Sequence, residues 1–427
     1  MTPSLIFLVQ ALVVISVPLA FLRFSGLKGL VPLVVVQIVV GIALGPSLFG
    51  RLAPELHQLL FNAAASAPLT GIASVAILVF GLITGLHVDT AALRENRRAI
   101  SVVAASNIAV PTALGAIAGF WVLARYPEEL APGTSPVEFA AAFGISIGMT
   151  ALPVLGALLH ELDLLGRRIG HLALAIAAVN DMVLWVALGV LLTVAAGQAA
   201  GGPGLLATLL FVPLYLAVMV RFVRPWLGGM VAARMRNGEV HERALALVGT
   251  VTIASSLATE AMGLHYILGA FITGVVMPDE LRKPLLDRLQ VLTMVLLMPF
   301  FFTLTGLRTV IDPHSSAFLG VFVLATVVAV AGVIGGTALA ARFVGASWPF
   351  ALGLGALLQT KGMMELIVLT ILLDAGIISP NVFAALILMA VVSTALAMPL
   401  ARLLLGRTAM GGVTPDRSPS EIGTFEA

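Results

Sequence analysis

The stretch ALLQTKGMMELIVL, residues Ala356–Leu369, decides the fold because it puts charge inside a segment apolar enough to cross a membrane. Its polar residues include Thr360, Lys361 and Glu365, and Gly362 follows the lysine directly. A charged side chain at the centre of a span costs about 2.5–3.5 kcal/mol, so each one needs a function or a partner. Glycine beside the charge indicates locally unwound backbone.

The composition of the whole chain agrees with a membrane protein. Of its 427 residues, 60% are hydrophobic and 10% are charged, and the mean hydropathy is +1.10. Soluble domains carry roughly 25% charged residues. A soluble enzyme, a nucleic-acid binder, a fibrous protein and a disordered chain are therefore excluded. The apolar stretches do not alternate with polar residues, which excludes an outer-membrane barrel.

The sequence motifs that would indicate an enzyme or a cofactor site are missing or incomplete. The chain has no cysteine, so disulfides, iron–sulfur clusters and thiolate metal sites are excluded. The HE pairs at His160 and His241 lack the second histidine of a zinc-protease helix. We therefore expect neither an enzyme nor a cofactor.

A membrane-length window predicts an all-α protein with thirteen spans and a short polar tail over 406–427 that we expect to be disordered. The predicted spans are 4–22, 29–48, 69–87, 99–123, 137–159, 169–197, 203–222, 243–261, 264–278, 289–307, 316–341, 349–373 and 381–405.

The distribution of positive charge predicts the orientation. Of the 23 Lys and Arg residues, 19 fall on one side of the predicted spans and only Arg51, Arg125 and Arg308 on the other. The positive side is cytoplasmic. We therefore expect a multi-pass inner-membrane protein with its N-terminus outside and its C-terminus in the cytoplasm. The first stretch lacks a positive n-region, so we interpret it as a retained helix.

An odd number of spans allows two inverted halves. These would cover about 1–197 and 243–405, with 203–222 as a linker helix and 1–405 as one transmembrane domain. Inverted repeats are a common way to build a secondary transporter.

Asp181 lies deep in the predicted span 169–197, in the sequence AIAAVNDMVLW, directly after Asn180. Twelve residues of helix place it roughly 18 Å from the cytoplasmic end, near the midplane. A carboxylate there indicates an ion or proton pathway. The structural alternative is an aspartate buried against a partner helix.

The span 137–159 contains a second interruption. Pro153 lacks an amide hydrogen and clashes with the carbonyl of Met149, which frees backbone oxygens around Met149 and Thr150. Together with the break expected at Gly362, this makes a matched pair of interrupted spans, which points to a transporter site. Lys361 could instead simply pair with Glu365 one turn on, in the less favourable order for a helix.

Several motifs resemble one family along residues 1–405. They are QIVVGIALGPSLFG (Gln37–Gly50), FGLITGLHVD (Phe80–Asp89), VNDMVLW (Val179–Trp185), YILGAFITGVVMPD (Tyr266–Asp279), LMPFFFTLTGLRT (Leu297–Thr309) and the segment Ala351–Phe383. The chain is thereby similar to monovalent cation:proton antiporters of family 2, which include Kef-type and NapA-type bacterial proteins and the plant cation/proton exchangers.

The resemblance implies an NhaA- or NapA-like fold, with a core bundle, a dimerisation bundle and two crossing broken helices. It makes Asp181 the carboxylate shared by cation and proton, with Asn180 and Thr150 completing the cation site. Lys361 and Glu365 map onto the crossover. Na⁺ or K⁺ and H⁺ would be the transported ions, in a homodimer within a lipid bilayer, with no nucleic-acid partner.

Two departures from the family pattern bear on stoichiometry. Electrogenic members carry two adjacent aspartates, whereas the first position here is Asn180. Many members also carry a lysine where this chain has Val333. One exchangeable carboxylate predicts electroneutral exchange of one cation for one proton. The alternatives are a passive or gated K⁺ channel of Kef type and a cation-coupled carrier of an organic solute.

Overall fold

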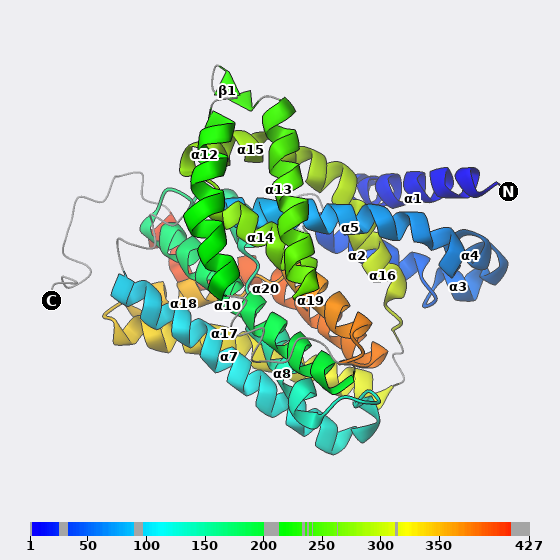
Figure 1. Ribbon diagram of the computed structural model, residues 1–427. Coiled ribbons are helices and arrows are strands. Elements are labelled where there is room, and N and C mark those ends of the chain that lie inside the picture. Colours follow the sequence, from blue (N-terminus) through cyan, green and yellow to red (C-terminus); the bar gives the residue numbers. More distant parts are fainter. Residues whose placement is uncertain are drawn as a thin grey trace. The chain divides into compact units, whose positions relative to one another are not determined.

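The computed structural model describes residues 2–24, 33–88, 97–199, 213–232, 235–236, 239–240, 242–262, 264–311 and 315–410 (Figure 1). Within these ranges the regular secondary structure is helical, apart from one antiparallel pair of two-residue strands, β1 (Met235–Arg236) and β2 (Glu239–Val240). The predicted all-α class is confirmed.

The α-helices are α1 (Pro3–Phe24), α2 (Leu33–Leu44), α3 (Phe49–Leu52), α4 (Pro54–Phe61), α5 (Ala63–Leu86), α7 (Arg97–Arg125), α8 (Pro136–Gly148), α9 (Leu152–Glu161), α10 (Arg168–Ala199), α12 (Arg224–Ala232), α13 (Glu242–Ala261), α14 (Tyr266–Val276), α15 (Asp279–Leu292), α16 (Met298–Arg308), α17 (Ser316–Phe343), α18 (Trp348–Leu358), α19 (Met363–Asp374) and α20 (Pro380–Met410). A 3₁₀ turn, η1 (Pro127–Glu129), and two π turns, η2 (Met219–Val223) and η3 (Thr293–Leu297), complete the described structure.

The predicted spans correspond to these helices. In the described part of the chain, nine helical runs are long and apolar enough to cross a membrane. The predicted spans 137–159 and 349–373 are each broken in two, and 264–278 is the short helix α14. Of the predicted linker span, residues 213–222 are helical and the rest lies outside the described residues.

Three boundaries differ from the prediction. Helix α5 begins at Ala63 rather than 69, because the Asn62 side chain accepts a hydrogen bond from the Ala65 amide at 2.8 Å. The span expected from 289 continues a helical run that begins at Asp279. The polar tail expected from 406 begins later, because α20 continues to Met410; residues 411–427 lie outside the described residues.

The chain divides into two compact units, each built from two separate segments. Unit 1 contains Met1–Val88 and Gly189–His314, and unit 2 contains Asp89–Leu188 and Ser315–Ala427. Each unit therefore combines a part of the N-terminal half with a part of the C-terminal half.

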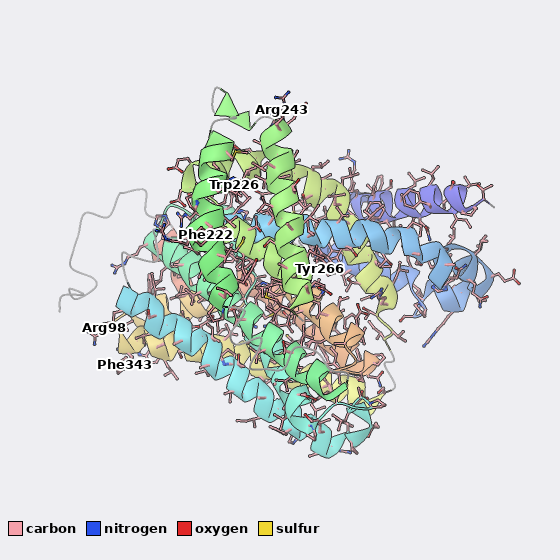
Figure 2. All side chains as sticks on the ribbon, viewed as in Figure 1. Arg98, Phe222, Trp226, Arg243, Tyr266 and Phe343 are labelled. Carbon is pink, nitrogen blue, oxygen red and sulfur yellow. The ribbon has the colours of Figure 1, made fainter. Side chains whose placement is uncertain are left out.

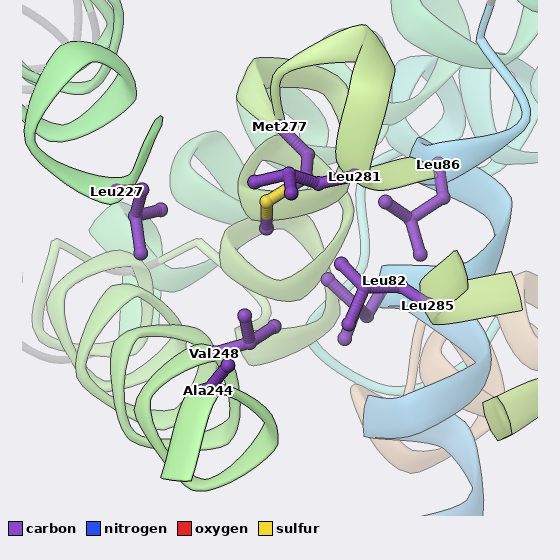
Figure 3. Packing of buried hydrophobic residues seen from close by; sticks show 8 residues of the cluster. All are labelled: Leu82, Leu86, Leu227, Ala244, Val248, Met277, Leu281 and Leu285. Atoms are coloured by element: carbon purple, nitrogen blue, oxygen red, sulfur yellow. The ribbon is translucent and has the colours of Figure 1, made fainter. Parts of the chain in front are cut away.

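Unit 1 is held together by glycines where its helices cross. Gly85 of α5 lies against Gly274 of α14, and Gly306 of α16 lies against Gly41 of α2. Small residues let helix backbones approach closely, which drives association in lipid. Beside the first crossing, α5, α12, α13 and α15, together with Met277 between α14 and α15, bury an apolar cluster (Figure 3). It comprises Leu82, Leu86, Leu227, Ala244, Val248, Met277, Leu281 and Leu285.

In unit 2, α7 packs against both α8 and α17, and α20 packs against α17 and α18. Glycine again permits the approach, since Gly144 of α8 lies against the backbone of Thr112 in α7. The Ser106 hydroxyl of α7 donates to the Gly336 carbonyl of α17 at 2.8 Å. Helices α7, α17 and α20 therefore pack against α8 and α18, each of which is one half of a broken helix.

Large apolar side chains are exposed on many of the helices. On η2 and α12, Phe222 and Trp226 are 66% and 49% exposed (Figure 2). Contiguous exposed apolar surface marks a membrane-contacting face. The membrane setting predicted from composition therefore agrees with the surface of the fold.

The glycine crossing in unit 1 can be tested by adding one methyl group. A Cβ at Gly85 would fall on the Phe271 carbonyl oxygen, so we expect Gly85→Ala to destabilise the protein by about 1–3 kcal/mol. Gly71 in the same helix has open space around it, and we expect Gly71→Ala to leave stability unchanged or slightly raised. Melting temperatures in detergent measure both. Equal melting of the two variants contradicts the close approach.

Candidate functional site

The first broken helix changes direction at Met149–Ala151. Helix α8 ends at Gly148, and both Met149 and Ala151 have extended backbone. Helix α9 then begins at Leu152, with proline among its first two residues, where a missing amide hydrogen costs nothing. The interruption predicted from Pro153 is confirmed.

The second broken helix changes direction at Gln359–Gly362. Helix α18 ends at Leu358 and α19 begins at Met363. Lys361 therefore lies in a non-helical linker rather than inside a helix, as the glycine beside it predicted.

Hydrogen bonds join the two linkers. The Ala151 amide donates to the Thr360 carbonyl at 2.8 Å, and the Thr150 hydroxyl donates to the Leu358 carbonyl at 2.9 Å. Both linkers are buried in unit 2. Because non-helical backbone inside a membrane must find partners within the protein, each linker supplies partners for the other.

The Lys361 side chain binds the carbonyl groups at the C-terminal end of α8. Its ammonium Nζ donates to the carbonyls of Ile147 (2.8 Å), Met149 (2.9 Å) and Ser146 (3.3 Å). The last carbonyls of a helix lack intrahelical partners and carry partial negative charge. Nζ also lies 3.8 Å from Glu365 Oε2, and both side chains are inaccessible to solvent. Lys361 and Glu365 thus form a buried ion pair anchored on the backbone.

Asn180 on α10 holds the first linker. Its Nδ2 donates to the Gly148 carbonyl and to Asn107 Oδ1, both at 3.0 Å, and its Oδ1 accepts from the Thr150 amide at 3.2 Å. Asn107 in turn donates to Thr337 Oγ1 of α17 at 3.0 Å. Both amide hydrogens of Asn180 are used, so Asn180 positions the linker.

Asp181 is completely buried, and neither carboxylate oxygen has a hydrogen-bond partner among the described residues. The carboxylate oxygens of Glu365 also lack hydrogen bonds there, but Glu365 has the Lys361 ammonium 3.8 Å away. Leaving a charged carboxylate buried and unpaired is very unfavourable, so Asp181 requires a proton or a cation. The requirement of the Asp181 carboxylate for a proton or a cation is the property that distinguishes this site.

The structure brings most of the sequence-predicted residues together. Thr150, Asn180 and Lys361 are joined by hydrogen bonds to one another or to the first linker. Glu365 lies 3.8 Å from Lys361, and Asp181 follows Asn180 on α10. Val333 is fully buried in α17.

Three further residues belong to the site. Asn107 of α7 accepts a hydrogen bond from Asn180. Thr394 of α20 donates to the Lys361 carbonyl, and Gln359 lies in the second linker. The polar character of Gln359 inside a span was the available signal, whereas nothing local distinguished Thr394.

Comparison with known proteins places these features in context. Residues 11–404 match the family model described as "Sodium/hydrogen exchanger, transmembrane". "Cation/H(+) antiporter 17" of Arabidopsis thaliana is 32% identical over 86% of this chain and 45% of its own length. "Na(+)/H(+) antiporter NhaS4" of Synechocystis is 29% identical over 90% of this chain and 92% of its own.

The chain spans less than half the length of the plant relatives it matches. Among solved structures, the sodium proton antiporter MjNhaP1 from Methanocaldococcus jannaschii superimposes with a TM-score of 0.59. The match covers 95% of this chain and 100% of that one at 14% identity, so it shows a shared fold.

Removing the Lys361 ammonium tests its structural role. We expect Lys361→Ala to destabilise the protein by about 3–5 kcal/mol, because three carbonyls and Glu365 lose a buried partner. Lys283→Ala, which truncates an exposed lysine of α15, is the control and should melt like the wild type. Thermal melting in detergent compares them. Unchanged melting of Lys361→Ala refutes this role.

Proposed function

The chain belongs to the family of transmembrane sodium/hydrogen exchangers, and from that premise we propose that it exchanges Na⁺ or K⁺ for H⁺ by alternating access. The observation that carries this proposal is the Asp181 carboxylate, which is completely buried and has no hydrogen-bond partner for either oxygen among the described residues. A carboxylate in that environment binds either a proton or a monovalent cation. Competition between the two ligands at one site couples their movements in opposite directions.

We propose Asp181 and Thr150 as oxygen ligands of the cation, and Asn180 as the residue that holds the linker in place. The Thr150 hydroxyl donates its hydrogen to Leu358, which leaves oxygen lone pairs for a cation. Asn180 was predicted as a ligand as well. Its carbonyl oxygen already accepts from Thr150, so a positioning role fits its contacts better.

The charges around the site support electroneutral exchange of one cation for one proton. Lys361 and Glu365 balance each other within the ion pair. Asn180 cannot titrate, and position 333 is a buried valine. We therefore propose that, among these described site residues, Asp181 is the group that changes its charge during a transport cycle.

We further propose that the two halves of the chain, about 1–197 and 243–405, are inverted repeats. The segments FGLITGL (Phe80–Leu86) and FFTLTGL (Phe301–Leu307) share the pattern F-x-x-x-T-G-L. Each places its glycine at a helix crossing, Gly85 against α14 and Gly306 against α2. The threonine of each segment donates to the carbonyl of its phenylalanine, at 3.0 and 2.9 Å.

For the cellular setting we propose an inner-membrane homodimer with its N-terminus outside and its C-terminus in the cytoplasm. The excess of Lys and Arg on one side of the spans supports this orientation. Dimerisation is an expectation from the family.

The two alternatives make different predictions for proton movement. A K⁺ channel conducts downhill without moving protons, so recording pH inside proteoliposomes separates it from an antiporter. A carrier of an organic solute requires a wider polar cavity, and the spans offer few polar side chains beyond those already engaged. The antiporter therefore remains the function that the site supports best.

Asp181→Asn tests the shared carboxylate. We expect it to abolish cation-dependent proton movement in proteoliposomes while thermal melting stays near the wild-type value, because neutralising an unpaired buried carboxylate removes no hydrogen bond. Asp287→Asn, at an exposed position of α15, serves as the matched control and should transport normally. Appreciable exchange by folded Asp181→Asn protein would contradict the assignment of Asp181 as the carboxylate shared by cation and proton.

The stoichiometry has its own test. We expect the initial rate of Na⁺/H⁺ exchange in proteoliposomes to be the same with and without a membrane potential set by valinomycin, because one charge moves each way per cycle. Proteoliposomes without the potential, prepared identically, provide the reference. Clear acceleration or reversal by voltage shows that more than one proton moves per Na⁺.

A further inference from the structure

Gln359 is an exception among the polar residues of the second linker. It caps the C-terminus of α18 and is completely buried. Neither its side-chain oxygen nor its side-chain nitrogen has a hydrogen-bond partner among the described residues. Its neighbours Thr360 and Lys361 are both hydrogen-bonded through their side chains.

A buried glutamine without partners does nothing for stability. Its amide offers two donors and an oxygen with two lone pairs. Leaving such groups unsatisfied costs about 1–3 kcal/mol each, whereas an apolar side chain of similar shape costs nothing of this kind. The unmet hydrogen-bonding capacity of Gln359 therefore points to a ligand that the protein chain itself does not supply.

Thr150 connects Gln359 to the carboxylate. The Thr150 amide donates to Asn180, which directly precedes Asp181, and the Thr150 hydroxyl donates to Leu358, which directly precedes Gln359. Asp181 and Gln359 are thus each one residue from a direct partner of Thr150. They belong to different elements, α10 and the second linker.

We infer that the side-chain carbonyl of Gln359 supplies an oxygen ligand to the transported cation, together with Thr150 and Asp181. This inference rests on the proposed antiporter function. A neutral oxygen helps to replace the hydration shell of the cation without adding charge. Because selectivity depends on the number and arrangement of ligands, Gln359 sets cation affinity and the preference between Na⁺ and K⁺. It leaves the number of protons exchanged unchanged.

The test replaces the amide by a side chain of similar length that cannot bind a cation. We expect Gln359→Met to raise the KM for the transported cation about tenfold or more, with melting in cation-free buffer unchanged or higher. Bound cation stabilises the folded protein by mass action. The rise in melting temperature on adding NaCl or KCl, over choline chloride, should therefore be lost in Gln359→Met and retained in Gln359→Glu.

Gln10 provides a matched control in unit 1. It is also completely buried, and its Oε1 likewise lacks a hydrogen-bond partner among the described residues, but its Nε2 donates to the carbonyls of Leu60 and Ala65. The same substitution, Gln10→Met, should lower the melting temperature and leave the KM unchanged. The two glutamines are thus expected to respond in opposite ways.

Failure of the inference and failure of the proposed function give different results. A wild-type protein without cation/proton exchange overturns the function, while the cation-dependent melting still tests Gln359 as a ligand. An unchanged KM and an unchanged cation-dependent shift in Gln359→Met overturn the inference. So does loss of folding in Gln359→Met, since a structural role would then account for the amide.

Discussion

The site depends on one buried ammonium group. Breaking α8 near the middle of a membrane leaves carbonyl groups that water cannot reach. Lys361 satisfies three of them at once, and Glu365 compensates its charge. The Lys361 ammonium, which lies in the second linker, thereby stabilises the C-terminal end of α8. Without it, the sharp change of direction at Met149–Ala151 would leave backbone groups unpaired in a low dielectric.

Because the two linkers are held in place, the polar side chains near them can be divided into those that have hydrogen-bond partners in the protein and those that have none. Asn180, Thr150 and Thr360 are each hydrogen-bonded to the linkers or to α7, so their positions are determined by the protein. Asp181 and Gln359 have no such partners among the described residues. Fixed neighbours around unpartnered oxygens are what the cation site proposed above requires, since a cation bound there would exchange its hydration shell for protein oxygens without rearrangement of the backbone.

Both units combine close helix packing with hydrogen bonds between helices. Unit 1 has glycine crossings and an apolar cluster, and the Ser255 hydroxyl of α13 donates to the Gly269 carbonyl of α14 at 2.8 Å. In unit 2, hydrogen bonds run from Ser106 to Gly336 and from Asn107 to Thr337, and Asn180 donates to Asn107. The bonds of Asn107 and Asn180 connect α17, α7 and α10 to the first linker, so this polar network holds the backbone of the candidate site.

The sequence by itself determined the membrane class, most span positions and the two interruptions, because apolar length, Pro153 and a glycine beside a charge act locally along the chain. It also singled out Asp181 and Lys361, since charge inside a span is costly anywhere. Only the tertiary structure decided their partners. The α8 carbonyls that bind Lys361 lie more than 200 residues away in sequence, and the unmet amide of Gln359 becomes apparent only once every neighbour is placed. Hydrogen-bond satisfaction is a property of packed atoms, and no local pattern encodes it.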